Sequence, residues 1–404
     1  FDLSVSLCVS VSLCLSLSHC VSPPEDVPNI ALLGSGGGER AAVGMLGSLH
    51  QLKKDDMLGS LLYMCGVSGT TWCMSSLYSD PDWSLNNRCV EVIKKMKGPM
   101  VDLKKVVDWL IMREDSDQDF SLTDFWGVFT ACYFMNEVSV WFMCVCLHVC
   151  LCLSVCLYVS FSASVEQFSP TVLTVGVWFE MTPHESGFSG LGAFVPTSCL
   201  RSRFKGRTLI EKRKEMDMVL LQGICGSAFA DTKENIAEVA KKIWGLFEGK
   251  PQCIALVSLQ GKYSIFWIVL IFFLLLIEWK WGTTSNFLFK IKDARVPESM
   301  ASNEKIHLVD AALKINSPYP PVLRTSRKVD LIISLDFSED PFETVFSAKK
   351  YADELKLPFP PVNEDIRKEK DHPQDCYVFE GRRPEEPTIM HMPLFNLRNC
   401  HGVW

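Results

Sequence analysis

The sequence predicts an α/β domain built on a central, largely parallel β-sheet. Two observations point to this class. Short apolar runs alternate with segments whose apolar residues recur at helical spacing, and glycine-rich turns follow the first two runs. The strand candidates are residues 30–33, 61–65, 219–222 and 331–337. The helix candidates are residues 41–52, 87–97, 103–113, 232–247 and 341–355.

Two glycine-rich turns carry the chemistry that the sequence suggests. The first is GSGGGERA at residues 34–41, whose backbone amides would line a helix N-terminus and could hold a phosphate or an oxyanion. The second is GVSGT at residues 66–70, where glycines around Ser68 permit the sharp turn that exposes a nucleophilic hydroxyl. Each turn alone is more often structural than catalytic. In this order, together, they indicate acyl transfer.

Nine further segments along the chain also carry information about the class of protein. They are FSLTDFWG (120–127), WFEMTPHE (178–185), GAFVPT (192–197), GICGSAFA (223–230), WGTTSNFL (281–288), HLVDAAL (307–313), VDLIISLDFS (329–338), LPFP (357–360) and CYVF (376–379). With the two glycine-rich turns, these segments resemble the cytosolic (group IV) phospholipases A2, most closely their gamma-like branch. The resemblance implies a patatin-like α/β catalytic domain with a nucleophile elbow and flanking helices.

The resemblance also implies the site residues. Ser68 matches the family's nucleophile and Asp310 matches the aspartate that acts as its base, a serine–aspartate dyad. The backbone amides of Gly37 and Gly38 match the oxyanion hole. Arg40 matches the arginine that meets the substrate phosphate, a role that the planar guanidinium fork suits better than an ammonium group.

The residues alone leave the identity of the base open. None of the eight histidines lies in a context that selects it as the partner of Ser68, and Asp330 and Asp336 compete with Asp310. Asp336 ends a predicted buried strand, where a carboxylate more often satisfies nearby backbone amides. The sequence also departs from the family at Ala312, where glycine is usual. If that position requires a positive φ, the alanine would displace Asp310.

Charge limits the classes of partner. The formal net charge of −7 argues against a nucleic-acid-binding protein, whose surface would be strongly basic. The basic stretch at residues 201–214 could bind anionic lipid headgroups, although a solvated charged surface is the simpler interpretation. For Arg40, a salt bridge to Glu39 or Asp55 is the alternative, and its position beside the glycine-rich turn favours the phosphate-binding role.

Low-complexity and apolar passages interrupt the resemblance. Residues 1–27 and an insertion at about 138–163 consist largely of Ser, Val, Leu and Cys, and a second insertion at 263–277 consists largely of Phe, Ile, Leu and Trp. We expect residues 28–404 to form the catalytic domain, C-terminally incomplete relative to the family. Retained non-coding sequence is the favoured origin of the insertions, because a membrane span there would place the halves of one domain on opposite sides of a bilayer.

No cofactor is expected, and calcium would enter only through a C2 domain upstream of this sequence. The 17 cysteines lack the spacing of a zinc site and fit free thiols in the cytoplasm. The expected partners are a phospholipid membrane surface and a glycerophospholipid substrate, with no nucleic acid and no obligatory protein partner, for a cytoplasmic protein peripheral to the membrane. The alternatives are a lysophospholipase or acyltransferase of the same dyad type, and a catalytically inactive lipid-binding or mispredicted family member.

Overall fold

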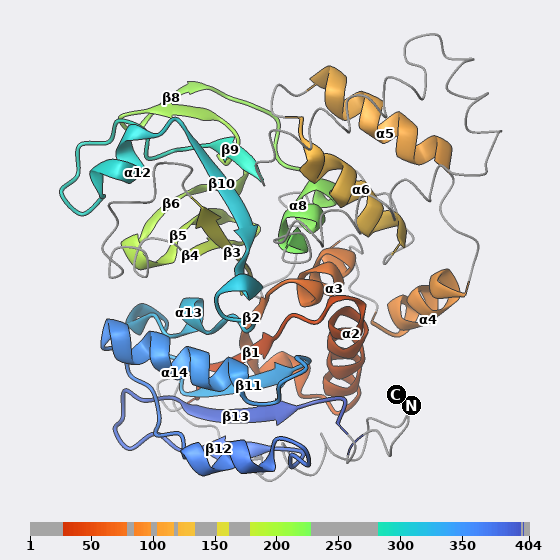
Figure 1. The fold of residues 1–404 in the computed structure, drawn as a ribbon, viewed down its shortest axis with the longest axis vertical. Helices are drawn as coiled ribbons and strands as arrows, with labels where there is room; N and C mark the ends of the chain where they lie inside the picture. The colour runs from red at the N-terminus through yellow and green to blue at the C-terminus, as the bar shows by residue number, and fades with distance from the viewer. Residues whose placement is uncertain are drawn as a thin grey trace.

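The computed structural model describes residues 27–78, 85–97, 103–116, 120–133, 152–160, 178–227, 282–396 and 399. Its centre is an 11-stranded mixed sheet in the order β12-β13-β11-β1-β2-β3-β4-β5-β6, with β10 paired to β3 and β9 paired to β10 (Figure 1). Neighbouring strands from β13 to β3 are parallel, and the other pairs are antiparallel. The predicted α/β class is confirmed.

The strands of the sheet and of a separate hairpin are β1 (Ile30–Gly34), β2 (Leu61–Gly66), β3 (Cys152–Ser160), β4 (Trp178–Met181), β5 (Glu185–Phe188), β6 (Ala193–Pro196), β7 (Arg203–Lys205), β8 (Thr208–Glu211), β9 (Thr283–Ser285), β10 (Lys305–Asp310), β11 (Leu331–Asp336), β12 (Tyr377–Phe379) and β13 (Thr388–Pro393). The described α-helices are α2 (Gly38–Lys54), α3 (Gly69–Tyr78), α4 (Leu85–Met96), α5 (Leu103–Ser116), α6 (Leu122–Tyr133), α8 (Met218–Cys225), α12 (Glu298–Ser302), α13 (Tyr319–Val322) and α14 (Glu343–Leu355).

The parallel strands divide their side chains between two hydrophobic cores. Leu32 of β1 and Ile333 of β11 belong to the core that includes α2 and α3, whereas Leu33 and Ile332 belong to the core that includes α13 and α14. Helices therefore cover both faces of the parallel strands, and every residue of β1 is buried. The carboxyl ends of β1, β2 and β11 meet at one edge, because Gly34 lies opposite Gly66 and Leu335 in the sheet.

Most predicted elements correspond to observed ones. The predicted strands at 30–33, 61–65 and 331–337 correspond to β1, β2 and β11, and the predicted helices at 41–52, 87–97, 103–113 and 341–355 correspond to α2, α4, α5 and α14. The predicted helix at 232–247 lies outside the described residues. The predicted strand at 219–222 is wrong, because these residues belong to α8. That short helix is buried on every side, so its apolar run carried no helical periodicity.

Strand β3 lies within the segment that was expected to be the first apolar insertion. It pairs with β2, β4 and β10. The rest of that segment and the second segment at 263–277 lie outside the described residues, so the boundaries of the insertions stay a prediction. Among the helices that the structure describes, none is both long and apolar enough to cross a membrane.

A buried ion cluster joins β4 to the segment between α13 and β11. The Glu180 side chain is 1% exposed, and its carboxylate contacts Arg324 at 2.8 Å and Arg327 at 2.9 Å. Arg327 also donates to the Pro321 carbonyl and stacks on the Tyr63 ring. The cluster therefore holds the segment between α13 and β11, which follows β10 in the sequence, against β4.

Candidate active site

Ser68 occupies a strained turn between β2 and α3. Its φ is 52°, in the left-handed region that costs a non-glycine residue about 1–2 kcal/mol. Hydrogen bonds to Thr70 hold the turn. The Thr70 hydroxyl lies 2.9 Å from the Gly34 carbonyl and 2.8 Å from the Val67 carbonyl, and it accepts from the Val67 amide at 3.0 Å. The elbow predicted from GVSGT is therefore present in the backbone.

The first glycine-rich turn lies against this elbow. Gly37 and Gly38 have φ values of 153° and 61°, and α2 begins at Gly38, so their amides belong to the unpaired first turn of a helix. A Cβ placed on Gly69 would lie only 2.0 Å from the Gly38 carbonyl oxygen, and one placed on Gly36 would lie 2.9 Å from Ser68 Cβ. Because Gly69 and Gly36 have no side chains, the two turns approach closely, and the predicted oxyanion amides lie beside the predicted nucleophile.

The sheet register brings Asp310 toward the same turn. Gly66 at the end of β2 pairs with Val155 of β3, and Asp310 at the end of β10 pairs with Leu157. Because β4 occupies the other edge of β3 at both positions, β2 and β10 share one edge, with their carboxyl ends facing each other. Two residues along a strand span about 7 Å. Asp310 therefore lies near the start of the turn that carries Ser68.

A second chain of contacts joins Asp310 to the elbow. The Thr71 hydroxyl donates to the Ser68 carbonyl at 2.5 Å and lies beside the Cys225 thiol. Burial raises the pKa of that thiol well above its usual range, and the nearby Asp310 carboxylate raises the pKa further. Asp310 itself has no exposed surface.

Ala312 does not strain the backbone beside Asp310. The φ of Ala312 is not positive, and its amide donates to Asp310 Oδ1 at 3.0 Å. The Asp310 amide in turn donates to the buried Ser227 hydroxyl at 2.9 Å. The alanine is compatible with the position that Asp310 occupies.

The Ser68 hydroxyl makes no hydrogen bond within the described part of the chain, so a direct Ser68–Asp310 contact stays a prediction. Catalytic hydrogen bonds are often longer without substrate. The described histidines have other partners where their contacts are known: His307 Nδ1 lies 2.9 Å from the Thr283 hydroxyl, and His391 contacts the Pro341 carbonyl. No described histidine hydrogen bonds to Ser68.

The two aspartates that compete with Asp310 for the role of base both accept hydrogen bonds from backbone amides. Asp330 is exposed at the amino end of β11, where it accepts from the Asn29 amide at 2.7 Å, at the opposite end of the strand from the elbow. Asp336 is buried at the carboxyl end and accepts from the Ser338 amide at 2.9 Å, as expected for a carboxylate that satisfies backbone donors.

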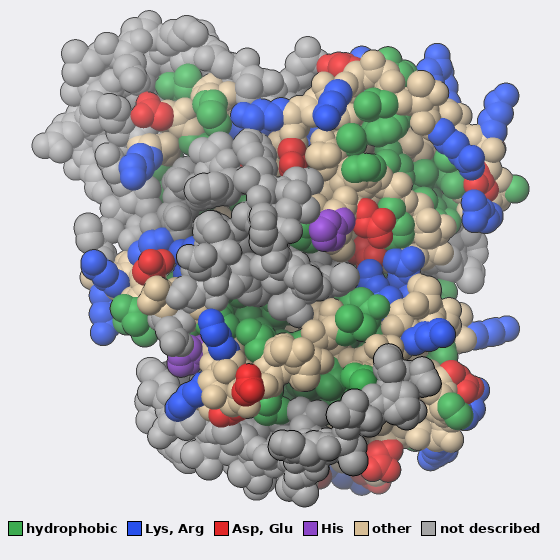
Figure 2. Space-filling view, turned by 180° about the vertical axis from the view of Figure 1, so that it is seen from behind, with side chains coloured by type: hydrophobic (Ala, Val, Ile, Leu, Met, Phe, Trp, Pro, Cys, Tyr) green, Lys and Arg blue, Asp and Glu red, His purple; other side chains and the backbone are tan. Residues whose placement is uncertain are grey.

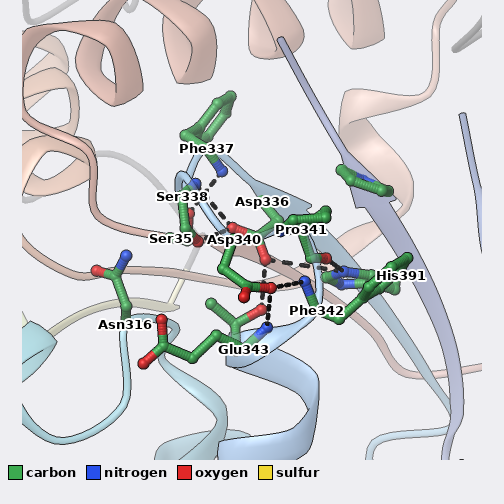
Figure 3. Close-up of polar contacts among 12 residues, drawn as sticks. Ser35, Asn316, Asp336, Phe337, Ser338, Asp340, Pro341, Phe342, Glu343 and His391 are labelled. Atoms are coloured by element: carbon green, nitrogen blue, oxygen red, sulfur yellow. Dashed lines mark hydrogen bonds and ion pairs between the residues drawn. The ribbon is translucent and has the colours of Figure 1, made fainter. Parts of the chain in front are cut away.

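Asp336 is part of the buried polar network drawn in Figure 3. Its Oδ2 accepts from the Thr344 hydroxyl at 2.5 Å and lies 3.7 Å from His391 Nε2 (Figure 3). His391 Nε2 lies 2.7 Å from the Pro341 carbonyl, which leaves the ring Nδ1 without a partner among the described residues. Both Asp336 oxygens are engaged, and the network fixes the turn after β11.

Arg40 binds this turn and not the neighbouring acids. Its Nε and Nη2 donate to the Phe337 carbonyl at 3.1 and 2.8 Å, and the Phe337 amide donates to the Ser35 hydroxyl at 2.7 Å. In the described part of the chain, neither Glu39 nor Asp55 forms an ion pair with Arg40. Arg40 is exposed at the start of α2. Its guanidinium group is oriented by backbone contacts beside the glycine-rich turn.

One residue of the site was missed from the sequence. The Gly36 amide donates to the Asn316 carbonyl at 3.1 Å, and a Cβ on Gly36 would lie 2.3 Å from Asn316 Oδ1. Asn316 comes shortly after Asp310, so it ties the Asp310 segment to the glycine-rich turn. No motif marks this position, because the contact exists only once β10 and β1 are brought together.

These features define the class of the site. A serine in the left-handed region between a strand and a helix, beside glycine amides at a second helix N-terminus, is the arrangement of an α/β serine hydrolase. The described residues contain no group of three side chains that could hold a metal ion.

Comparison with known proteins defines the family. The family model for the lysophospholipase catalytic domain matches residues 30–242. Human cytosolic phospholipase A2 gamma is 31% identical in an alignment of 445 residues with its gaps, and the alignment covers 94% of this chain and 81% of that protein. Mouse cytosolic phospholipase A2 zeta is 29% identical over 430 residues, covering 92% of this chain and 50% of that protein. The structure of human GIVD cytosolic phospholipase A2 has a TM-score of 0.75 at 22% identity, covering 98% of this chain and 56% of that one.

The chain belongs to the cytosolic phospholipase A2 family of carboxylic ester hydrolases. The predicted family and fold are confirmed. The chain spans about half the length of the zeta relative and of the solved structure.

Proposed function

We propose that the chain is a phospholipase A2-type serine esterase that hydrolyses fatty acyl esters of membrane glycerophospholipids. One observation carries the proposal. Ser68 is held in a strained turn against the glycine-rich loop, at the point where β2 and β10 meet end to end and β10 delivers Asp310. In this proposal, three separate segments supply the nucleophile, the oxyanion donors and the carboxylate base.

In the proposed reaction, Asp310 accepts the proton of the Ser68 hydroxyl while Oγ attacks the ester carbonyl carbon. The Gly37 and Gly38 amides donate to the resulting oxyanion, each contributing about 3 kcal/mol. Collapse of the tetrahedral intermediate breaks the ester C–O bond, and the leaving lysophospholipid alkoxide takes the proton from Asp310. Water, deprotonated by Asp310, then attacks the acyl-serine and releases the fatty acid and Ser68.

Arg40 is proposed to bind the substrate phosphate. Two of its guanidinium nitrogens are engaged with Phe337, and Nη1 has no partner among the described residues. The positive end of α2 adds to the attraction for an anion at this place. The reaction needs no cofactor, since Ser68 and Asp310 supply the nucleophile and the base. The site of action is proposed to be a membrane surface in the cytoplasm.

The description of the matching family model favours a second candidate, hydrolysis or transfer of the single acyl chain of a lysophospholipid by the same dyad. Both activities pass through an acyl-serine. They differ in whether a diacyl or a monoacyl lipid is consumed and in whether water or an alcohol accepts the acyl group. A catalytically inactive lipid-binding protein is the remaining alternative.

A fluorophosphonate tests the proposal, because such inhibitors react with activated serines and one is bound in the structure of human GIVD cytosolic phospholipase A2. We expect methyl γ-linolenyl fluorophosphonate to label the full chain at Ser68. Ser68→Ala should abolish labelling and ester hydrolysis, Asp310→Asn should slow both by about 10²–10⁴-fold, and the exposed control Ser60→Ala should change neither. Hydrolysis should persist in a metal chelator.

Two substrates separate the candidates. Release of fatty acid from doubly acylated phosphatidylcholine supports the phospholipase, and release only from lysophosphatidylcholine supports the second candidate. Equal labelling of Ser68→Ala and the natural chain would refute Ser68 as the nucleophile. Absence of labelling in a folded protein that binds lipid vesicles would establish the inactive alternative.

A further inference from the structure

The β7–β8 hairpin and the loop beside it form a strongly cationic surface, which we call the basic patch (residues 203–214 and 289–295). These residues include nine Lys or Arg and two Asp or Glu, a formal charge of +7 in a chain whose net charge is −7. Lys and Arg side chains gather at the upper right of Figure 2, the side on which the hairpin lies in Figure 1 once the view is reversed. The charge of the protein is therefore unevenly distributed.

The two segments form one continuous surface. The Gly206 amide at the hairpin turn donates to the Phe289 carbonyl at 2.9 Å, and Arg207 forms an ion pair with Asp293 at 3.1 Å. Arg207 and Lys290 have φ values of 75° and 55°, which glycine adopts without cost. Cations thus occupy two strained positions in this patch, and such strain is concentrated at functional sites.

The acids within the basic patch do not neutralise it. Glu211 and Asp293 each contact two arginines at 2.8–3.4 Å, namely Arg203 and Arg213 for Glu211, and Arg207 and Arg295 for Asp293. Hydrogen bonds from Arg295 hold the pKa of Asp293 well below its usual range, so this carboxylate stays ionised. At Asp293, one negative charge shared by two arginines leaves one positive charge in excess, whereas Arg203 is also paired with Glu304 at 2.7 Å.

Four lysines of the basic patch carry uncompensated charge. They are exposed and form no ion pair in the part of the chain that the structure describes: Lys205, Lys212, Lys290 and Lys292. Beside them, Leu209 and Ile210 are consecutive on β8 and are 42% and 58% exposed. Because neighbouring side chains of a strand point to opposite faces, the hairpin presents an aliphatic side chain on each face.

From this combination we infer that the basic patch docks the protein on an anionic phospholipid bilayer. Lysines and arginines near such a surface attract it, and aliphatic side chains enter the interface. A nucleic acid would be expected to stack on exposed aromatic rings, whereas Phe204 and Phe289, the aromatic residues of the patch, are both partly buried. The inference rests on the proposed function, to which it adds the surface that meets the membrane and the charge of the lipid.

The basic patch is linked to the proposed active site through β10. Glu304, just before β10, accepts from Arg203 of the hairpin at 2.7 Å, and Asp310 ends the same strand. The six residue steps of extended chain from Glu304 to Asp310 span about 20 Å. The distance from a bilayer at the basic patch to the proposed Ser68–Asp310 dyad is therefore about the length of one phospholipid molecule.

Vesicle binding of the full chain tests the inference. Sedimentation is measured with vesicles of phosphatidylcholine alone and with added phosphatidylserine, at low and high salt. A patch variant replaces Lys205, Lys212, Lys290 and Lys292 by glutamine. Its matched control replaces four exposed lysines elsewhere, Lys54, Lys94, Lys350 and Lys356. Thermal melting and hydrolysis of a soluble monomeric ester are recorded for every protein.

We expect the natural chain to bind the anionic vesicles and to lose binding as salt rises. The patch variant should bind them at least about tenfold more weakly, since each basic residue near the surface contributes roughly fivefold. The control should bind within about twofold of the natural chain. Leu209→Ser with Ile210→Ser should weaken binding at high salt, where the apolar contribution remains.

Equal vesicle binding by the patch variant and its control would overturn the inference, as would binding of a nucleic acid in place of vesicles. The proposed function fails separately: it fails if the natural chain does not hydrolyse any ester, whatever the vesicle result. A patch variant that melts normally and hydrolyses the soluble ester, yet loses binding to anionic vesicles, supports both.

Discussion

Replacing Gly69 by alanine should disrupt the proposed site from its backbone outward. The new Cβ would lie 2.0 Å from the Gly38 carbonyl oxygen and 2.7 Å from the Gly38 amide nitrogen. Both are backbone atoms at the start of α2, so no side-chain rotation relieves the overlap, and the two turns must separate by about 1 Å. Displacement on that scale costs about 10²-fold in rate. Loss of one oxyanion donor alone costs about 10²–10³-fold.

We therefore expect Gly69→Ala to lower kcat by 10²–10³-fold and the free energy of unfolding by about 1–3 kcal/mol, the usual range for overpacking. The assay is hydrolysis of a soluble ester together with denaturant unfolding. Gly59→Ala is the matched control, because a Cβ there meets no atom within 4 Å, and it should change kcat by less than twofold. If Gly69→Ala retained full activity and stability, the close approach of the two turns would not exist in the protein.

Three further predictions concern strain, the buried ion cluster and β3. Ser68→Gly should be more stable than Ser68→Ala by about 1 kcal/mol in denaturant unfolding, because glycine relieves the positive φ of 52°; equal stabilities would contradict the strained elbow. Glu180→Gln should lower the free energy of unfolding by about 3 kcal/mol, because it removes the buried negative charge that Arg324 and Arg327 contact, whereas Glu364→Gln at an exposed pair should cost under about 0.5 kcal/mol. Deleting Cys152–Ser160 should abolish soluble expression, since it removes the strand between β2 and β4; a soluble, cooperatively melting product would contradict that role.

The parts of the fold that are local in sequence were predictable. The buried parallel strands β1, β2 and β11 are continuous apolar runs, and the amphipathic helices α2 and α14 show their spacing directly. The position of Ser68 was also predictable, because a serine between glycines after an apolar run is a local signal for a tight turn. These predictions rest on one segment at a time.

The antiparallel half of the sheet was not predictable in the same way. Strands such as β5 (Glu185–Phe188) and β12 (Tyr377–Phe379) are short, and β5 begins with polar residues. Their hydrogen bonds come from neighbours that other parts of the fold bring to them. The contacts of Arg40 with Phe337, and of Asn316 with Gly36, were missed for the same reason. Each joins segments that lie about three hundred residues apart.

The position of Ser68 relative to Asp310 depends on β3, the strand whose composition gave the least information about its structure. Its Cys, Val, Leu and Ser residues suggested an insertion, yet valine-rich apolar sequence also suits a strand between two neighbours. What β3 supplies to the site is backbone register: it holds the carboxyl ends of β2 and β10 two residues apart on one edge. Side-chain identity in β3 should therefore matter less than its length, because gaining or losing one residue there would shift Asp310 by one position against the elbow.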